Sequence, residues 1–359
     1  GRVERFPEIF EYLMKLSIER PITLFIDEFQ EFFKVNKSVY SDMQRIWDMY
    51  HTKAHINLIV CGSIFSMMTK IFKDKKEPLY NRQTRFMSIK PFTPAVLKEI
   101  MAEYNPNYTS EDLLALYSFT GGVAKYVQLL VDAGATTKTK MLNHIIKADS
   151  VFLGEGKAIL IEEFGKDYGV YFSILSAIAR GKTLRSEIEQ IVGREIGGYL
   201  TKLEKEYEVI TKNQPIFEKS STKNVRYTIE DNFFTFWFRF IYKYNYMLEI
   251  ENYDAVKTII NRDYETFSGK MLERYFKRVL MESKAYTRIG SWWDRKGENE
   301  IDIVAENELN DEAVFIEVKR KEDNFDAIAL NEKVDVFTRA TGKFKDYTVS
   351  QKGLSMTDM

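Results

Sequence analysis

The chain has little cysteine and no long hydrophobic run. Its 359 residues contain a single cysteine, Cys61, which excludes an internal disulfide framework. No segment approaches the roughly 18 consecutive apolar residues that a membrane span requires. We therefore predict a cytoplasmic protein with no membrane contact. Gly1-Arg2-Val3-Glu4 has neither a Met nor an apolar h-region, which favours an artificial or internal start over a signal peptide.

A strong net charge is also absent. The sequence has 52 Lys and Arg against 53 Asp and Glu, a formal net charge of −1. Any contact with nucleic acid must therefore come from a local patch rather than from a bulk basic field. Hydrophobic residues at 45% and aromatics at 14% are enough to fill several cores, so disorder is not expected. The length favours two or three domains.

A helix and two apolar strands are predicted near the start of the sequence. Apolar residues at helical spacing predict a helix over residues 6–19, which Pro21 ends. Strands are predicted at residues 24–28 and 56–61, separated by an amphipathic helix that includes Trp47. The order strand, helix, strand implies a parallel sheet.

Polar residues stand at the ends of both predicted strands. Asp27 and Glu28 end the first strand, and Ser63 follows the second. Ligands of open α/β sheets bind at the carboxyl ends of parallel strands, so these three residues are candidates for a site. The alternative is a buried strand whose terminal acids are only solvated.

Leu24-Phe25-Ile26-Asp27-Glu28 resembles the Walker B element of a P-loop ATPase. The resemblance implies that Asp27 orients Mg²⁺ or its waters, that Glu28 polarises the attacking water and that Ser63 senses the γ-phosphate. The matching phosphate loop, Gly-x-x-x-x-Gly-Lys-Ser/Thr, occurs nowhere in the sequence. The chain is therefore similar to the downstream part of a nucleotide-binding protein, and its own affinity for ATP is expected to be poor.

The segment Pro78–Arg85 closely resembles archaeal-type ATPases, a prokaryotic branch of the AAA+ and STAND P-loop ATPases. In that family it usually reads Pro-Leu-Tyr-Gly-Arg-x-Thr. Asn81 stands where Gly is common, a mild departure because Asn also tolerates positive φ. The resemblance implies that Arg82 is an arginine finger or γ-phosphate sensor, with Arg85 as a second candidate for nucleotide contact. A surface arginine in a turn is the alternative for each.

Residues 1–92 are accordingly interpreted as the downstream part of a P-loop ATPase core, and residues 93–164 as a helical lid. Thr109-Ser110-Glu111-Asp112 is typical of a capped helix start. Thr120–Tyr126 resembles a turn of the same family, with Ala124 in place of the usual Pro. We assign no chemistry to this turn.

Residues 165–235 are predicted to form a winged helix-turn-helix. Helices are expected from about residues 170, 184 and 195, followed by a hairpin of residues 209–211 and 226–229. Over residues 165–230, eleven Lys and Arg stand against nine Asp and Glu, which is weak for a surface that grips phosphates. DNA binding and protein contact both remain open for this module.

Residues 236–270 are interpreted as connecting helices. The segment Asp231–Phe240 resembles an aromatic signature of the same ATPases. Aromatic side chains at helical spacing indicate a packed core rather than a ligand platform.

Two predicted strands near the end of the chain carry charged residues at alternate positions. Glu300 and Asp302 lie in one strand, and Glu317 and Lys319 in the next. Side chains alternate along a strand, so Ile301 and Ile303 are expected on the face opposite the two acids of the first strand. Asp302, Glu317 and Lys319 can then converge.

This pattern resembles the core of PD-(D/E)XK nucleases. The resemblance implies that Asp302 and Glu317 hold Mg²⁺ and that Lys319 positions or activates the attacking water. Glu273, in a preceding amphipathic helix, resembles the acid that the first helix of that fold often supplies to the metal. The alternative is an inactive nuclease-like fold whose acids form salt bridges.

Residues 271–359 are interpreted as an α/β restriction-endonuclease-like domain. In the resembled family this region usually has that shape, and Trp292-Trp293-Asp294-Arg295 matches its motif. Lys333, Val336 and Phe337 suggest a further helix. The last residues, Gly353–Met359, are expected to be frayed or truncated.

The predicted fold class is a multidomain α/β protein that combines a partial P-loop NTPase sheet, a helical lid, a winged helix-turn-helix and a restriction-endonuclease-like domain. The resemblance implies ATP and Mg²⁺ as cofactors, ATP hydrolysis in an intact parent, and double-stranded DNA as a partner that is bound or cleaved. The resemblance is also compatible with a homo-oligomer. One alternative is a nucleotide-regulated switch for protein contacts with an inactive nuclease-like domain. Another is metal-dependent cleavage as the one remaining activity.

Overall fold

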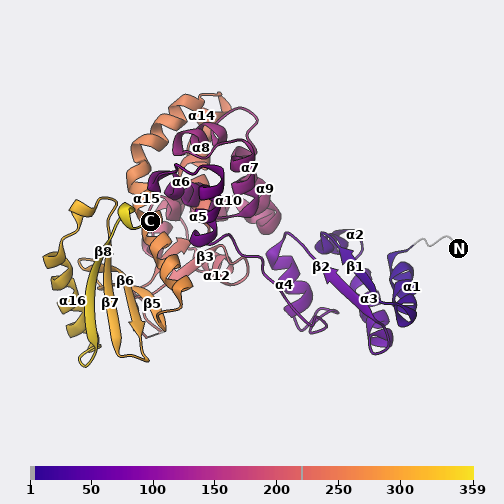
Figure 1. The fold of residues 1–359 in the computed structure, drawn as a ribbon. Helices are drawn as coiled ribbons and strands as arrows, with labels where there is room; N and C mark the ends of the chain where they lie inside the picture. Colours follow the sequence, from indigo (N-terminus) through magenta and orange to yellow (C-terminus); the bar gives the residue numbers. More distant parts are fainter. Residues whose placement is uncertain (1–4, 220) are drawn as a thin grey trace. The chain divides into compact units, whose positions relative to one another are not determined.

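The computed structural model describes residues 5–219 and 221–359. The predicted chain start at residues 1–4 lies outside these ranges. The chain divides into two compact units, one formed by Gly1–Ile89 with Ile161–Gly165 and the other by Lys90–Leu160 with Lys166–Met359. Both can be followed along the chain in Figure 1.

The first unit contains a two-stranded parallel sheet. Strands β1 (Ile22–Ile26) and β2 (Ile56–Val60) pair in register from Ile22 opposite Ile56 to Ile26 opposite Val60. The predicted α/β class and parallel pairing are confirmed. Strand β1 ends at Ile26, so Asp27 and Glu28 follow the strand instead of ending it. The other elements of this unit are α1 (Phe6–Glu19), η1 (Phe29–Glu31), α2 (Phe32–Val35), α3 (Ser38–Tyr50) and α4 (Phe65–Lys73).

The two faces of this sheet differ. Leu24 and Leu58 point into a core formed by helices α1, α3 and α4. Phe25 and Ile59 point the other way and are 59% and 42% exposed. Parallel sheets are normally covered on both faces, so this sheet has the pattern of a part of a larger one.

Residues 93–164 are mostly helical, as predicted. Thr109 and Asp112 form a capping box in which the Asp112 N–H donates to Thr109 Oγ1 and the Thr109 N–H donates to Asp112 Oδ2. The capped start inferred from the sequence is therefore confirmed. The helices are α5 (Pro94–Tyr104), α6 (Ser110–Thr120), α7 (Ala124–Asp132), α8 (Lys138–Ile145) and α9 (Val151–Phe164).

Helices and a hairpin follow in the predicted order. Helix α10 spans Tyr168–Ala179, α11 spans Arg185–Val192 and α12 spans Gly197–Lys205, after the short η2 of Gly165–Asp167. Strands β3 (Ile210–Asn213) and β4 (Arg226–Ile229) then pair antiparallel. The assignment of this arrangement as a winged helix-turn-helix stays a prediction.

The aromatic segment forms a buried core, as its spacing indicates. Phe233, Phe236, Trp237 and Phe238 are each at most 2% exposed. The segment is α-helical at first and then continues as a π-helical turn. The elements here are α13 (Asn232–Phe236), η3 (Trp237–Tyr242), α14 (Asn245–Glu249) and α15 (Tyr253–Ser283).

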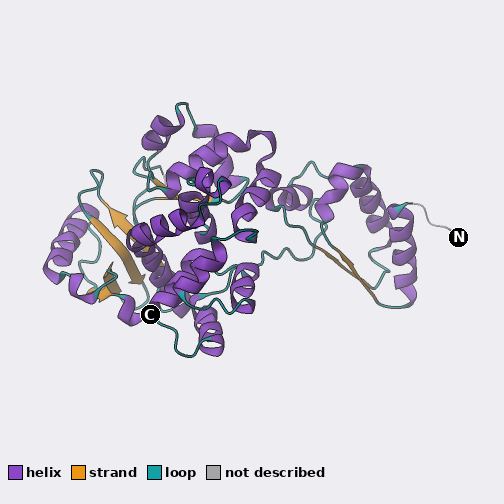
Figure 2. Ribbon diagram, turned by 90° about the horizontal axis from the view of Figure 1, so that it is seen from above, coloured by secondary structure: helices purple, strands orange, loops and turns teal. Residues whose placement is uncertain are grey.

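A four-stranded sheet forms the last part of the chain. Its strand order is β5-β6-β7-β8, with β7 and β8 parallel and the other pairs antiparallel. Helices α15 and α16 pack on opposite sides of it (Figures 1 and 2). The elements are β5 (Arg288–Trp293), β6 (Glu300–Asn307), β7 (Glu312–Val318), η4 (Glu322–Asn324), α16 (Ala327–Thr341), β8 (Thr348–Leu354) and η5 (Met356–Asp358).

The end of the chain is structured, so the expectation of a frayed Gly353–Met359 is wrong. Strand β8 pairs with β7 from Thr348 opposite Glu312 to Leu354 opposite Val318. Most β8 side chains are exposed, so the strand lacks the apolar alternation that would reveal it in the sequence. Backbone pairing with β7 holds it in place.

The prediction that side chains alternate strictly between the two faces of β6 is also wrong. The pairing with β5 shifts between Gly290, which lies opposite Val304, and Trp292, which lies opposite Ile301. An extra residue in β6 makes a β-bulge, and Ile301 shares its hydrophobic cluster with Val304 instead of with Ile303. Bulges redirect side chains, and this one lies beside Asp302.

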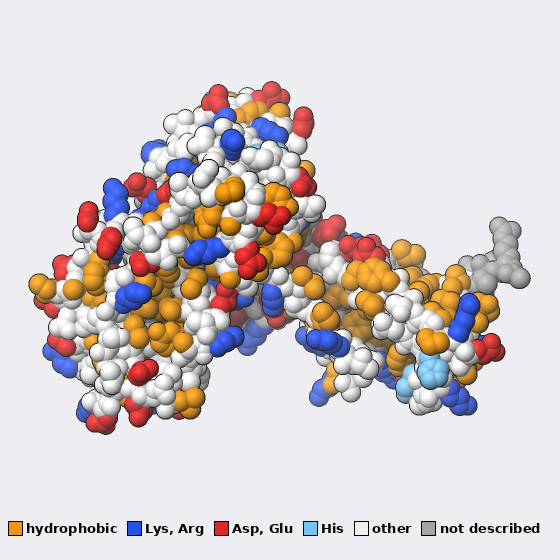
Figure 3. Space-filling model, in the orientation of Figure 1, with side chains coloured by type: hydrophobic (Ala, Val, Ile, Leu, Met, Phe, Trp, Pro, Cys, Tyr) orange, Lys and Arg blue, Asp and Glu red, His pale blue; other side chains and the backbone are white. Residues whose placement is uncertain are grey.

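Charges of both signs are mixed on the surface. Over the face drawn in Figure 3, acidic and basic side chains are interspersed and do not form one continuous field. This distribution agrees with the net charge of −1. Within residues 5–219 and 221–359, no helix combines the length and the apolar character needed to cross a membrane.

We expect Gly353→Ala to destabilise the protein by about 1–3 kcal/mol, the usual cost of overpacking. A Cβ at this position would lie 2.6 Å from the ring of Phe325. Gly269→Ala in α15 is the control, because a Cβ there meets nothing within 4 Å. This control should be neutral or stabilising by about 0.5–1 kcal/mol. Urea unfolding measures the stability of both variants. Equal changes in stability would contradict the close packing of β8 against Phe325.

We also expect Asp231 to make stability depend on pH. Its carboxylate caps α13 by accepting from the Phe233 and Phe234 N–H groups, but burial raises its pKa to about 6. The folded protein thus binds a proton more readily than the unfolded chain between pH about 4 and 6. This contribution to stability is present at low pH and is lost as the pH rises through about 6.

The comparison variant is Asp231→Asn, which keeps a capping side chain and removes the titration. The free energy of unfolding of the variant should rise relative to that of the wild type as the pH goes from 4 to 7.5. A difference that does not change with pH would show that Asp231 keeps an ordinary pKa.

Candidate functional site

Asp27 lies at the carboxyl edge of the parallel sheet. It follows β1, and Cys61 follows β2 directly beside it, with the Cys61 N–H donating to the carbonyl of Ile26 at 3.0 Å. The Cys61 thiol donates to Asp27 Oδ1 at 2.7 Å, and the Glu28 N–H donates to the same oxygen at 2.9 Å. These two bonds lower the pKa of Asp27, so the exposed carboxylate is an anion available to a cation.

Glu28 and Ser63 meet at this edge, as the sequence predicts. Ser63 Oγ donates to Glu28 Oε2 at 2.9 Å, and the Ser63 N–H donates to it at 3.3 Å. Gln30 Nε2 also donates to this oxygen. The bonds from Gln30 and Ser63 lower the pKa of Glu28. The site therefore presents two adjacent ionised carboxylates.

The backbone around Glu28 is constrained. Glu28 has φ +47°, a left-handed conformation that costs a non-glycine residue about 1–2 kcal/mol. Gln30, which holds it, is buried next to Gly62, where a Cβ would lie 2.1 Å from Gln30 Oε1. A side chain at position 62 would therefore displace Gln30 from this place.

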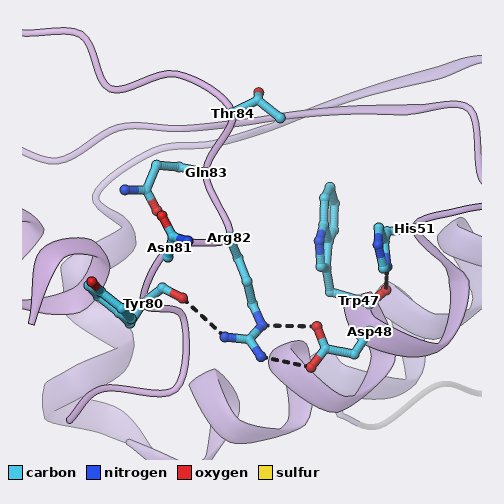
Figure 4. Close-up of a pocket in the computed structure, with 8 residues that line it drawn as sticks. All are labelled: Trp47, Asp48, His51, Tyr80, Asn81, Arg82, Gln83 and Thr84. Carbon is cyan, nitrogen blue, oxygen red and sulfur yellow. Dashed lines mark hydrogen bonds and ion pairs between the residues drawn. The ribbon is translucent and has the colours of Figure 1, made fainter. Parts of the chain in front are cut away.

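Arg82 lies in a separate hollow of about 540 Å³ in the same unit (Figure 4). Its guanidinium donates to both oxygens of Asp48 at 2.9 and 2.8 Å and to the carbonyls of Pro78 and Tyr80. Asn81 has φ +58°, in agreement with the tolerance expected of Asn there. The described contacts of Arg82 are thus structural, and they do not include Asp27.

Arg85 is exposed. Neither arginine is brought to the Asp27 edge by a described contact, so their nucleotide roles remain predictions.

The second group of candidates lies where β6 begins and β7 ends. Pairing of these strands stops at Ile303 opposite Ile316. Beyond that point the Val318 N–H donates to Asp302 Oδ2 at 2.8 Å. The carboxylate takes the place of a backbone acceptor, which lets the strands separate without leaving a buried N–H unpaired. Burial raises the pKa of Asp302, and the charge of Glu317 raises it further.

Glu317 is held by two lysines. Lys319 Nζ lies 2.7 Å from Glu317 Oε1, and Lys333 Nζ lies 3.0 Å from both of its oxygens. Glu317 is only 7% exposed, so this partly buried anion is neutralised by its two cations. Burial lowers the pKa of Lys319, but the bond and charge of Glu317 outweigh this, and the net pKa is raised.

Glu273 approaches from helix α15. Burial raises its pKa to about 7, Lys270 at 2.9 Å opposes the rise, and the charge of Asp302 adds to it. The charges of Asp302 and Glu273 also act on Lys319. Lys319 is therefore within reach of the charges of all three predicted acids, and Glu273 and Asp302 line one cavity.

Sequence reasoning missed several contributors. Lys333 and Lys270 each pair with one of the predicted acids, and Gln30 and Cys61 hold the first site. Lys270 precedes Glu273 by one helical turn, a signal that the sequence does contain. The contact of Lys333 depends on how α16 packs and has no local signal.

The donors suit a hard cation at either site. Mg²⁺ takes oxygen ligands and is typically held by one or two protein carboxylates together with substrate phosphates. Asp27 at the first site, and Asp302 with Glu317 at the second, are carboxylates of this kind. Within the described ranges, no three His, Cys, Asp or Glu residues already form a metal-binding group.

Comparison with known proteins agrees with the ATPase resemblance. The family described as an ATPase domain predominantly from Archaea matches residues 3–130. A second family, described as archaeal bacterial proteins of unknown function, matches residues 237–348.

Two relatives come from Methanocaldococcus jannaschii, and both are uncharacterized proteins. One is 33% identical over 314 residues, which cover 83% of this chain and 67% of the relative. The other is 34% identical over 56 residues, which cover 16% of this chain and 54% of the relative. Among solved structures, the Walker-type ATPase PABY2304 of Pyrococcus abyssi is similar with a TM-score of 0.48 and 20% identity, covering 66% of this chain and 68% of that one.

The chain thus belongs to the archaeal ATPase family, and its beginning is an ATPase-type domain. Its matched part spans about two thirds of the longer relative from Methanocaldococcus jannaschii.

We expect Arg82 and Asp48 to be coupled in stability. Both are partly exposed, so a double-mutant cycle of Arg82→Ala and Asp48→Ala should give a coupling free energy of about 0.5–1 kcal/mol. The control cycle pairs Arg85→Ala with Asp48→Ala and should give none. Urea unfolding measures both cycles, and equal coupling in the two would argue against the observed ion pair.

Proposed function

We propose that this protein is part of a nucleotide-controlled enzyme that cleaves nucleic acid with the help of a divalent metal ion. The observation that carries the proposal is the group formed by Asp302, Glu317, Lys319 and Glu273 where β6 and β7 separate. A carboxylate pair, a further acid on α15 and a lysine suit the hydrolysis of a phosphodiester.

The residues have separable roles in this proposal. Asp302 and Glu317 would hold Mg²⁺, which supplies charge stabilisation and activates water when it is bound. The Val318 N–H orients Asp302, and Lys333 keeps Glu317 in place. Lys319 then offers an ammonium group to the attacking water or to the phosphate.

The ATPase-type domain would control this activity. At its sheet edge Asp27 is the ligand for Mg²⁺, and Glu28, positioned by Ser63 and Gln30, is the group that accepts a hydrogen bond from water. ATP bound with Mg²⁺ would supply the free energy of hydrolysis. The phosphate cradle that this chemistry needs is not among the 359 residues, so hydrolysis is proposed for a protein that contains it. Arg82 and Arg85 are proposed to contact nucleotide there.

The two lysines that pair with Glu317 favour an alternative function. An acid that is neutralised by Lys319 and Lys333 serves equally as a structural salt bridge. In that case the nuclease-like part is inactive, and the protein is a nucleotide-regulated switch for protein contacts. The predicted winged helix, with its near balance of charges, would then be a protein-binding module.

Cleavage of supercoiled and linear DNA in Mg²⁺ or Mn²⁺ separates these functions. We expect Asp302→Ala and Lys319→Ala each to lower the rate on the order of 100-fold or more, the scale of a lost transition-state contact. Glu308→Ala and Lys321→Ala are matched controls, because both side chains are exposed and neither belongs to the group. Thermal unfolding checks that every variant is folded.

Absence of cleavage in the wild type, or equal cleavage by all five proteins, would reject the nuclease and favour the switch.

A further inference from the structure

A large cavity lies within the second unit, beside the proposed metal site. It has a volume of about 1150 Å³ and is lined by the β3–β4 hairpin, helix α15 and strands β5 and β6. Glu273 and Asp302 belong to its wall. The volume exceeds the range of about 300–1,000 Å³ that is usual for small-molecule pockets.

The wall of this cavity is more basic than the rest of the protein. Eight Lys and Arg line it against five Asp and Glu, whereas the whole chain has a net charge of −1. The basic residues are Arg180, Arg226, Arg239, Lys270, Arg274, Lys277, Arg278 and Arg288. The acidic residues are Glu218, Glu230, Glu273, Glu300 and Asp302.

Half of these cations come from one face of α15. Lys270, Arg274 and Arg278 are four residues apart, and Lys277 follows Arg274 by three, so all four lie on one side of the helix. At 1.5 Å per residue they extend over about 12 Å. The row spans the position of Glu273, which also lines the cavity.

Two of these cations lack an anionic partner among the described residues. Arg274 donates to the neutral Asn232 Oδ1 at 3.0 Å, and burial lowers its pKa, although the charges of Glu230, Glu273 and Asp231 act on it. No described ion pair involves Lys277, whose pKa burial also lowers, although the charge of Glu230 acts on it. A desolvated cation is costly unless an anion accompanies it. The cavity therefore favours a ligand that supplies negative charge along this row.

The geometry of the ligand follows from the cavity. A row of cations suits several successive phosphates better than a single one. A volume of about 1150 Å³ has room for a few linked nucleotides, whereas a duplex needs a broad basic surface. Residues 165–230, which include the hairpin beside the cavity, have eleven Lys and Arg against nine Asp and Glu, a weak excess for gripping a duplex.

We propose that this cavity binds a single strand of nucleic acid, with its phosphates along Lys270–Arg278 and one phosphodiester at Glu273 and Asp302. The identity of the ligand rests on the proposed nuclease function, because the same cavity contains two of its carboxylates. The protein would then act on single strands or on strand ends that have separated from a duplex.

Fluorescence anisotropy with a short labelled oligonucleotide tests this binding in EDTA, where no cleavage occurs. We expect the single strand, as DNA or RNA, to bind more tightly than the duplex of the same sequence. Lys277→Glu should weaken binding several-fold and lower the slope of log affinity against log salt by about 0.7 per lost contact. Lys284→Glu, an equal charge change at the exposed end of the same helix, should leave both unchanged.

Arg278→Glu provides a second variant if Lys277→Glu fails to fold, because Arg278 is exposed. Equal affinity of both cavity variants and Lys284→Glu would overturn the proposal, as would equal binding of duplex and single strand. Competition by a mononucleotide as strong as that of the oligonucleotide would overturn it too.

Failure of the two proposals can be told apart. Single-strand binding that depends on Lys277, without cleavage in Mg²⁺ or Mn²⁺, would leave the cavity as a binding site and reject the nuclease. Cleavage that depends on Asp302, with no effect of Lys277→Glu on binding, would support the nuclease and reject the cavity as the binding site.

Discussion

The hydrogen bond from the Val318 N–H to Asp302 holds open the end of the C-terminal sheet, and the chemistry proposed for this protein depends on it. Antiparallel pairing of β6 and β7 has stopped by this point, and a side-chain carboxylate replaces the missing backbone acceptor at 2.8 Å. A buried N–H without a partner would pull the strands back together. With the bond in place, Lys319 lies within reach of the charges of Glu317 and of Glu273 on α15.

The ATPase-type domain uses a related device at the edge of its own sheet. Here the strands are parallel, and the turn after β1 carries Glu28 in a left-handed conformation that Gln30 and Ser63 hold by hydrogen bonds. In both places a carboxylate is fixed where regular pairing ends. The two sites differ in what surrounds their other acid. Asp27 of the first site is exposed, whereas Glu317 of the second is paired with two lysines.

The sequence predicted the elements whose signals are local. Apolar spacing located α1, and the capping residues located the start of α6 at Thr109 and Asp112. The aromatic run 233–240 was correctly interpreted as core. Strand β8 was missed because its side chains are exposed and its pairing partner lies far away in the sequence. The bulge in β6 was missed because periodicity assumes an uninterrupted ladder.

The sequence by itself determined the α/β class, the order of the elements and the acids that follow the strands, because these depend on propensity and spacing within short segments. Only the tertiary structure decided which charges meet. It paired Arg82 with Asp48, and it brought Lys333 from α16 to Glu317. It also gathered cations of α15, β4 and β5 around one cavity. Such contacts join residues far apart in the chain, and packing alone sets the distances on which their electrostatic interactions depend.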